Sequence, residues 1–307
     1  MFIYMEHFEP KRLKQLYVPP QDSHKGQNGK LLVIGGSHLF HAASLWALTI
    51  ASRIVDMVFY SSVIENNQIV QELKKEFRNG IVVPRDAIED YVGEADAILI
   101  GPGMVRTEQG VRDKALGASL EEINKLEDEG LQSYYLTKYL LAKYPKKKWV
   151  IDAGALQMME PEWLLQLNGN VVITPHPGEF GRVESGIKNK ELKKELEKKS
   201  LEEKAQLFAR EFHCIVLLKG EEDVVCSSDT CVSVSGGNAG MTKGGTGDVL
   251  AGLVAALSCN NSIFLAACAG SYFNKKAGEA LFEKVGYYFN ASDLADEIPV
   301  VVRKLLT

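Results

Sequence analysis

The chain has 307 residues, of which 46% are hydrophobic and 24% are charged, and this ordinary globular composition excludes a disordered protein. Its net charge of -5 argues against a nucleic-acid partner, because a nucleic-acid-binding domain usually carries a basic face. The first residues include the acidic Glu6 and no long apolar core, which is unlike a signal peptide. The most apolar stretch, residues 249–270, is interrupted by Asn260 and Asn261, so it predicts two core helices and no membrane span.

The five cysteines indicate a reducing compartment. Their number is odd, and no two of them form a C-x-x-C pair. We therefore expect all five to be reduced residues in or near the core, and we expect the protein to be cytoplasmic. They are Cys214, Cys226, Cys231, Cys259 and Cys268.

Seven short runs of β-branched and other apolar residues predict buried strands. The runs are nearly continuous rather than alternating, and many are separated by longer helical patterns, which is typical of parallel strands covered on both faces. The sequence therefore predicts an α/β fold, a three-layer α/β/α sandwich with a mostly parallel central sheet. The runs are residues 31–34, 57–60, 81–83, 97–100, 149–151, 171–173 and 215–218.

The remaining segments are compatible with this fold. Residues 108–143 predict two or three helices broken by glycines. Residues 188–210 intersperse Lys and Glu around a narrow apolar stripe, which favours a solvated helix face over a basic docking surface. Residues 223–235 predict a β-hairpin. The sequence contains no internal repeat or linker, so we expect one domain over residues 1–307, with residues 1–24 as an extension that packs on it.

Five of the predicted strands end in loops that contain glycine, proline or charged residues. These loops begin at Gly35, Gly101, Asp152, Thr174 and Lys219. The carboxyl ends of parallel strands lie at one edge of the sheet, and open α/β sheets bind ligands at that edge. The five loops therefore predict a shared ligand site.

A glycine-rich run over residues 236–248, which ends G-G-T-G-D, is the strongest single signal. Apolar residues at helical spacing follow it, so the glycines precede a helix N-terminus, where free N–H groups and the helix dipole attract anions. We predict that this turn holds nucleotide phosphate and that Asp248 deprotonates a substrate hydroxyl. The alternative is a plain turn with Asp248 as helix N-cap, but six glycines within residues 236–247 favour function.

His176 lies between two prolines at a strand exit, three residues before Glu179. The prolines hold it outside a helix or strand ladder, which favours a ligand contact over a structural role. The sequence matches neither a dinucleotide-binding G-x-G-x-x-G motif nor a Walker A motif, so a Rossmann oxidoreductase and a P-loop enzyme are both disfavoured. No residues have metal-site spacing, so we expect any metal to arrive with the nucleotide, held by phosphate oxygens and water.

Four motifs together resemble one family. In sequence order they are K-G-Q-N-G-K-L-L-V-I-G-G-S at residues 25–37, I-G-P-G at 100–103, T-P-H-P-G-E at 174–179 and N-A-G-M-T-K-G-G-T-G-D-V-L-A-G at 238–252. Their combination resembles the nucleotide-dependent NAD(P)H-hydrate dehydratases of the ribokinase-like fold, although many kinases of that fold share the G-T-G-D turn alone. The resemblance implies an enzyme that phosphorylates the ring hydroxyl of hydrated NADH or NADPH with ATP or ADP. Loss of phosphate then restores the ring.

The resemblance also implies roles for individual residues. Asp248 would be the catalytic base, Ala43, Gly103 and His176 would contact the hydrated dinucleotide with it, and Glu179 would organise Mg²⁺ through water. We further expect a homo-oligomer. The site for ADP or ATP would comprise Lys219, Gly220, Glu221, Glu222, Asp223, Asn238, Gly245, Thr246 and Gly247.

The sequence departs from the family pattern at three places. Gly154 stands where the family usually has a second aspartate after Asp152. Residues 221–223 add negative charge after Lys219, which Mg²⁺ or Lys243 would offset. Many relatives also carry an N-terminal epimerase domain for which this chain has no room, so the resemblance implies a separate epimerase as partner.

Two other functions stay open on the sequence alone. A vitamin kinase of the ribokinase-like fold, acting on a hydroxymethyl-pyrimidine or a thiazole, would use Asp248 in the same way but stop at the phosphorylated product. A non-catalytic nucleotide-binding or regulatory protein would account for Gly154 and for the acidic residues 221–223.

Overall fold

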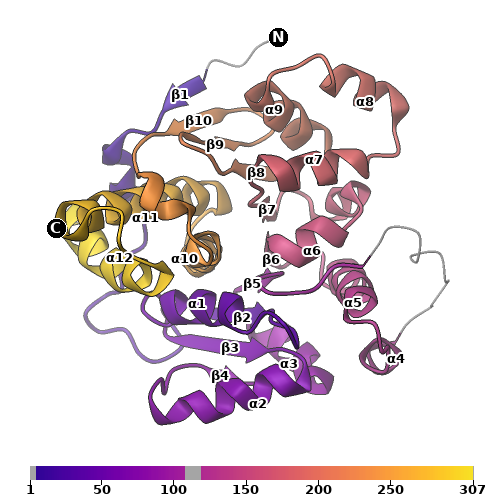
Figure 1. Ribbon diagram of the computed structural model, residues 1–307, viewed down its shortest axis with the longest axis vertical. Coiled ribbons are helices and arrows are strands. Elements are labelled where there is room, and N and C mark those ends of the chain that lie inside the picture. Colours follow the sequence, from indigo (N-terminus) through magenta and orange to yellow (C-terminus); the bar gives the residue numbers. More distant parts are fainter. Residues whose placement is uncertain (1–4, 108–118, 307) are drawn as a thin grey trace.

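The computed structural model describes residues 5–107 and 119–306, and a ten-stranded sheet runs through its centre (Figure 1). The strand order is β1-β10-β9-β8-β7-β6-β5-β2-β3-β4. β9 is antiparallel to both neighbours, and the other described pairs are parallel. The strands are β1 (Met5–His7), β2 (Lys30–Ile34), β3 (Met57–Ser61), β4 (Ile81–Val82), β5 (Ala97–Ile100), β6 (Lys148–Ile151), β7 (Val171–Ile173), β8 (Ile215–Leu218), β9 (Asp223–Cys226) and β10 (Cys231–Val234).

Helices cover both faces of the sheet, which confirms the predicted three-layer sandwich. Because successive strand residues point to opposite faces, Leu31 and Val33 of β2 enter one core while Leu32 and Ile34 enter the other. Figure 1 shows α1, α10, α11 and α12 on one side and α5, α6, α7 and α9 on the other. The helices are α1 (Ala42–Ala51), α2 (Ile64–Glu72), α3 (Ile88–Glu94), α4 (Leu120–Asn124), α5 (Glu129–Lys143), α6 (Ala153–Met158), α7 (Pro177–Ser185), α8 (Lys190–Leu196), α9 (Leu201–Glu211), α10 (Thr246–Asn260), α11 (Ile263–Val285) and α12 (Ala291–Leu306).

The seven predicted strands are confirmed, each to within one residue of the predicted ends, and the predicted hairpin is β9 and β10. The apolar stretch 249–270 is divided between α10 and α11, and Ser262 caps α11 by accepting a hydrogen bond from the Leu265 N–H at 3.3 Å. None of the described helices combines the length and the apolar composition that a membrane span requires. The helices predicted within residues 108–143 correspond to α4 and α5, and residues 108–118 lie outside the described part of the chain.

The N-terminal segment contributes a strand that the sequence analysis missed. β1 is three residues long and pairs with β10, and its alternation of Met, Glu and His gives no apolar run to detect. After β1, Phe8, Leu13 and Leu16 are buried in the core shared by α10, α11 and α12. The Tyr17 N–H then donates to Asn261 Oδ1 at 2.8 Å.

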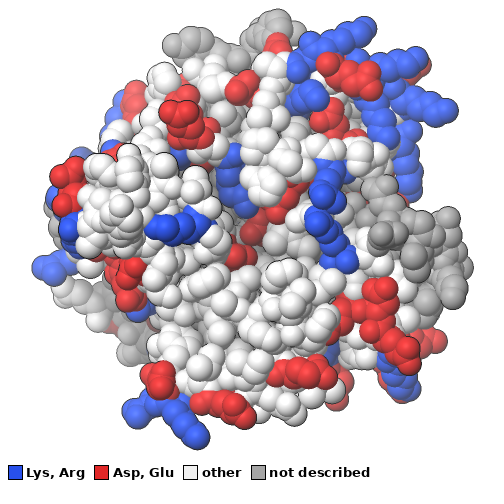
Figure 2. All heavy atoms as spheres, viewed as in Figure 1, with Lys and Arg blue, Asp and Glu red and all other residues white. Residues whose placement is uncertain are grey.

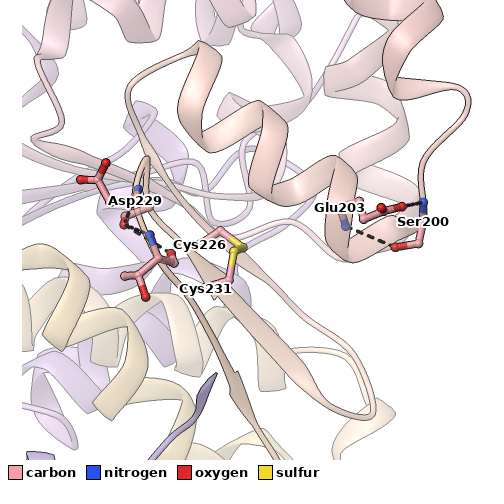
Figure 3. Close-up of a disulfide and its surroundings, with 7 residues drawn as sticks. Ser200, Glu203, Cys226, Asp229 and Cys231 are labelled. Atoms are coloured by element: carbon pink, nitrogen blue, oxygen red, sulfur yellow. Dashed lines mark hydrogen bonds between the residues drawn. A yellow bond between two sulfur atoms is a disulfide. The ribbon is translucent and has the colours of Figure 1, made fainter. Parts of the chain in front are cut away.

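The prediction that every cysteine is reduced is wrong for one pair. Cys226 and Cys231 form a disulfide within the β9–β10 hairpin (Figure 3). The two residues are direct partners in the antiparallel ladder, so the hairpin brings their side chains together. A search restricted to C-x-x-C spacing could not detect such a cross-strand pair. The other three cysteines are free and buried.

Candidate functional site

Three charged side chains meet where the carboxyl ends of β6, β7 and β8 lie side by side. Lys219 Nζ lies 3.1 Å from Asp152 Oδ1 and 3.6 Å from Glu179 Oε2. Burial opposes the charge of Lys219, but Asp152, Glu179 and Asp248 outweigh it and hold the pKa of Lys219 above its ordinary value. On the face shown in Figure 2, charged side chains of both signs lie close together near the centre of the molecule. The structure thus brings three of the predicted loops into one polar site.

The glycine-rich run leads into α10 as predicted, and the N-cap residue of this helix provides no side-chain hydrogen bond. Gly245, the N-cap, has a φ of 96°, which glycine adopts without strain. The Thr246 hydroxyl donates to two carbonyl oxygens of the preceding loop at 2.6 and 2.9 Å, so it holds the turn. A Cβ built on Gly247 would lie 3.4 Å from Lys219 Nζ. The Lys219 ammonium therefore lies beside the first turn of α10, where backbone N–H groups lack intrahelical partners, and this combination suits a phosphate group.

Asp248 lies in the first turn of α10. Its burial and the nearby negative charge of Asp152 raise the pKa of Asp248 to about 7, and Glu179 adds to this effect while Lys219 opposes it. Two states of the carboxyl group are therefore close in free energy at neutral pH. A group of this kind can accept a proton during a reaction and release it afterwards.

The first turn of α7 fixes His176 and Glu179 together. His176 Nδ1 accepts hydrogen bonds from the N–H groups of Gly178 and Glu179 at 3.0 and 3.3 Å, and the His176 N–H donates to Glu179 Oε2 at 3.0 Å. This is a capping box with histidine as N-cap. Because Nδ1 is an acceptor, the neutral ring carries its proton on Nε2. Nε2 lies 3.6 Å from Glu179 Oε2, and the His176 side chain is 57% exposed, so a ligand can reach the ring beside Glu179.

Ala43, in the first turn of α1, and Gly103, in the loop that follows β5, form a wall of small residues beside the carboxyl ends of the neighbouring strands β2 and β5. Gly103 has a φ of 73°, and a Cβ built there would lie 2.7 Å from the carbonyl oxygen of Phe40 and 3.2 Å from Ala43 Cβ. The position therefore accommodates glycine and excludes larger residues. β5 also pairs with β6, which is followed by Asp152, so this wall lies on the part of the sheet edge next to the charged group.

An open cavity of about 1180 Å³ extends away from Lys219 and Gly247. It is lined by every residue predicted for the nucleotide site except Gly245, whose position is packed against Trp46. The Asn238 side chain, however, is engaged with the protein, because its Oδ1 accepts from the Gly240 N–H and its Nδ2 donates to the Gly278 carbonyl oxygen. Asn238 therefore lines the cavity through its backbone, together with the neighbouring residues of the glycine-rich run.

Known proteins with similar sequences identify the family of this chain. The family model described as NAD(P)H-hydrate dehydratase matches residues 31–300. The chain belongs to the NAD(P)H-hydrate dehydratase family. The ADP-dependent (S)-NAD(P)H-hydrate dehydratase of Nitrosopumilus maritimus is 34% identical over 310 residues, which cover 95% of each protein.

Two further comparisons concern the length and the fold of this NAD(P)H-hydrate dehydratase family member. The bifunctional NAD(P)H-hydrate repair enzyme Nnr of Archaeoglobus fulgidus is 32% identical over 289 residues, which cover 92% of this chain but 52% of the relative. The chain therefore spans about half the length of that relative. A ribokinase-like superfamily protein from Enterococcus faecalis superposes with a TM-score of 0.78 at 22% identity, over 98% of this chain and 96% of the other, which confirms the ribokinase-like fold.

The departure from the family pattern at Gly154 has a steric explanation. A Cβ built on Gly154 would lie 2.0 Å from the carbonyl oxygen of Met104. The turn that begins at Gly101 is held here by hydrogen bonds from the N–H groups of Met104 and Gly154 to the Gly101 carbonyl oxygen, at 2.9 and 3.3 Å. In this member of the family, backbone occupies the space where an aspartate side chain would begin.

A lysine that the sequence analysis missed lies against residues 220–223 and offsets the charge of Asp223. Lys275 on α11 is 5% exposed, and its Nζ lies 2.8 Å from the Glu221 carbonyl oxygen, 3.1 Å from that of Gly220 and 3.3 Å from Asp223 Oδ1. Lys243, which we expected in this role, instead donates to the carbonyl oxygens of Tyr287 and Phe289. The adjacent pair Lys275 and Lys276 within the largely apolar segment 263–281 is the signal that could have drawn attention to Lys275.

The donor set of the site suits a hard cation only in part. Asp152 and Glu179 supply carboxylate oxygens, but both contact Lys219. Within residues 5–107 and 119–306, no group of three or more His, Cys, Asp or Glu side chains could hold a metal ion. Mg²⁺ binds through a few carboxylates, water and substrate phosphates, so these residues fit an ion that arrives with a nucleotide.

Proposed function

We propose that this protein is a nucleotide-dependent NAD(P)H-hydrate dehydratase, a carbon–oxygen lyase, in which Asp248 is the catalytic base. The observation that carries the proposal is Asp248 itself, whose pKa is raised to about 7 by burial and by Asp152. It stands in the first turn of α10 beside the phosphate-binding point formed by Lys219 and Gly247. Family membership and the 34% identical relative named as such a dehydratase support it.

The proposed reaction has two steps. Asp248 takes the proton of the ring hydroxyl, and the oxygen attacks the terminal phosphorus of the nucleotide while the bond to the bridging oxygen breaks. The phosphate then leaves the ring with the electrons of its carbon–oxygen bond, the ring nitrogen supplies an electron pair, and loss of a proton from the adjacent carbon restores the double bond. Phosphate is a far better leaving group than hydroxide, so phosphorylation makes elimination feasible at neutral pH.

The residues around Asp248 would act by position and charge. Lys219 and the Gly247 N–H would hold the transferred phosphoryl group, because phosphoryl transfer is accelerated mainly by alignment and charge stabilisation. The Nε2–H of His176 and the small-residue wall of Ala43 and Gly103 would contact the hydrated dinucleotide. Mg²⁺, when bound beside Glu179, would neutralise charge on the nucleotide phosphates.

Several finer features belong to the proposal as well. We favour ADP as the phosphate donor because the relative from Nitrosopumilus maritimus is named as ADP-dependent. That name also supports the (S) hydrate as substrate. A separate epimerase, a homo-oligomeric state and a cytoplasmic location stay predictions from the sequence.

One assay tests the proposed function. Hydrated NADH is incubated with ADP or ATP, Mg²⁺ and the protein, and the return of the NADH absorbance is followed. The wild type should restore NADH, whereas Asp248→Asn should bind nucleotide normally and react at least about 100-fold more slowly, because a positioned base contributes that much or more. Equal background rates for the two proteins would eliminate the dehydratase, and nucleotide consumption without NADH would instead indicate a kinase.

A further inference from the structure

Asn274 on α11 is a buried amide that the proposed reaction does not use. The residue is 5% exposed, and its Oδ1 atom has no hydrogen-bond partner in the described structure. A buried carbonyl oxygen without a partner disfavours the folded state, and asparagine is a poor helix former. An unfavourable residue on the wall of a cavity points to a ligand that pairs with it.

The position of Asn274 is defined by its neighbours on α11. Three residues earlier, the Ser271 hydroxyl donates to Asp223 Oδ2 at 2.7 Å, and four residues later the Gly278 carbonyl oxygen accepts from Asn238 Nδ2 at 2.7 Å. Residues three and four positions apart share a helix face. Asn274 therefore lies between the two loops that form the walls of the cavity, and its side chain is part of the lining.

The cavity has one charged end and one less polar side. Lys219 and the start of α10 form the charged end, which suits phosphate. On the α11 side the charge of Lys275 is engaged by Asp223 and by backbone carbonyl oxygens. Met241 of the glycine-rich run lines the cavity there too, and its Sδ would lie 2.3 Å from a Cβ built on Gly278, one turn from Asn274. A nucleotide has the same distribution, with charged phosphates at one end and a flat base at the other.

We propose that Asn274 reads the base of the bound nucleotide and selects adenine. This inference rests on the proposed function, which places ADP or ATP in the cavity. A carboxamide offers an acceptor and a donor side by side, which match the 6-amino group of adenine and an adjacent ring nitrogen. Oδ1 is shielded from solvent in this structure, so the contact requires rotation about the last torsion of asparagine, which is only loosely restricted.

The test compares ADP with purine riboside 5′-diphosphate, which lacks the 6-amino group. Calorimetry gives the dissociation constants of both ligands for wild type, Asn274→Ala and Asn124→Ala. Asn124 is the matched control, because it also has a buried Oδ1 without a partner in the described structure but lies on α4, outside the cavity lining. Asn274→Ser replaces Asn274→Ala if the latter does not fold.

The wild type and Asn124→Ala should bind ADP about tenfold more tightly than the analogue, the effect of one hydrogen bond. Asn274→Ala should bind both ligands equally, with the loss confined to ADP, and its melting temperature should equal or exceed that of the wild type. A wild-type preference that persists in Asn274→Ala overturns the role of Asn274 and leaves the proposed function intact. Failure of the wild type to bind either diphosphate overturns both proposals.

Discussion

The Asp248 carboxyl group has a higher pKa in the folded protein than in the unfolded chain, so its contribution to stability depends on pH. The pKa of Asp248 is about 7 in the folded protein, against an ordinary value of 3.8. Between these values the folded protein binds a proton that the unfolded chain has lost, so the contribution of this group to stability falls as the pH rises. Above pH 7 the loss is complete.

Asp248→Asn removes this ionisation and should stabilise the protein increasingly as the pH rises. The free energy of unfolding of the variant, relative to wild type, should grow by about 2–3 kcal/mol between about pH 5 and pH 7. Urea unfolding across that range measures the change, with Asp86→Asn at an exposed position as control. A difference that does not vary with pH would mean that Asp248 has an ordinary carboxyl pKa.

His176 combines a structural and a proposed binding role in one ring, and two substitutions separate them. Asparagine keeps an N-cap acceptor for the N–H groups of Gly178 and Glu179, whereas alanine removes it. His176→Asn should therefore keep the wild-type stability to within about 0.5 kcal/mol, and His176→Ala should lose about 1 kcal/mol. Both variants should raise the KM for hydrated NADH, because both remove the Nε2–H donor.

Chemical unfolding and steady-state kinetics of the two His176 variants check these expectations. A normal KM in His176→Asn would show that the ring serves only as a helix cap. Equal stability of the two variants would show that the capping box contributes nothing measurable.

At the scale of elements, the start of α10 is the feature on which nucleotide binding is expected to depend. Gly247→Ala places a methyl group in van der Waals contact with Lys219 Nζ, at 3.4 Å, in the space that an incoming phosphate would need. We expect the dissociation constant for ADP to rise about tenfold or more, a loss of one charge-assisted hydrogen bond. Helix stability should not fall, because alanine is the better helix former.

Gly244→Ala is the matched control for Gly247→Ala. It lies in the same glycine-rich run, but a Cβ built on Gly244 has no heavy atom within 4 Å. Calorimetry with ADP on both variants makes the comparison. Similar affinities in the two variants would contradict a phosphate site at this turn.

Elements that leave a local pattern in the sequence could be predicted, whereas contacts between distant segments could not. β2, β5 and α10 were predictable because a buried strand or helix leaves an apolar run of characteristic length. Lys275 and the Cys226–Cys231 pair were not, because each depends on contacts across the fold: Lys275 with the loop 220–223, and the two cysteines as partners in one ladder. Lys243 was misplaced for the same reason, since only the tertiary structure sets the carbonyl oxygens of Tyr287 and Phe289 beside it.

For the molecule as a whole, the sheet separates two cores, and the N-terminal segment closes one of them. β1 covers the outer edge of β10. Phe8, Leu13 and Leu16, which follow β1, are buried in the core formed with α10, α11 and α12. β10 is followed by Ser235 and Gly236 in the cavity wall, so this segment supports the strand that positions part of the proposed nucleotide site.

A chain that lacks residues 1–24 should therefore be less stable and prone to associate. Loss of three buried apolar side chains should lower the free energy of unfolding by about 3–5 kcal/mol, and the uncovered edge of β10 should promote pairing between chains. The double variant Leu13→Ala, Leu16→Ala is the matched comparison, because it loses apolar burial while β1 still protects the edge. It should lose comparable stability and keep the association state of the full chain. Urea unfolding and light scattering distinguish the two effects, and a truncated chain with unchanged stability and association would show that the segment lies outside the folding unit.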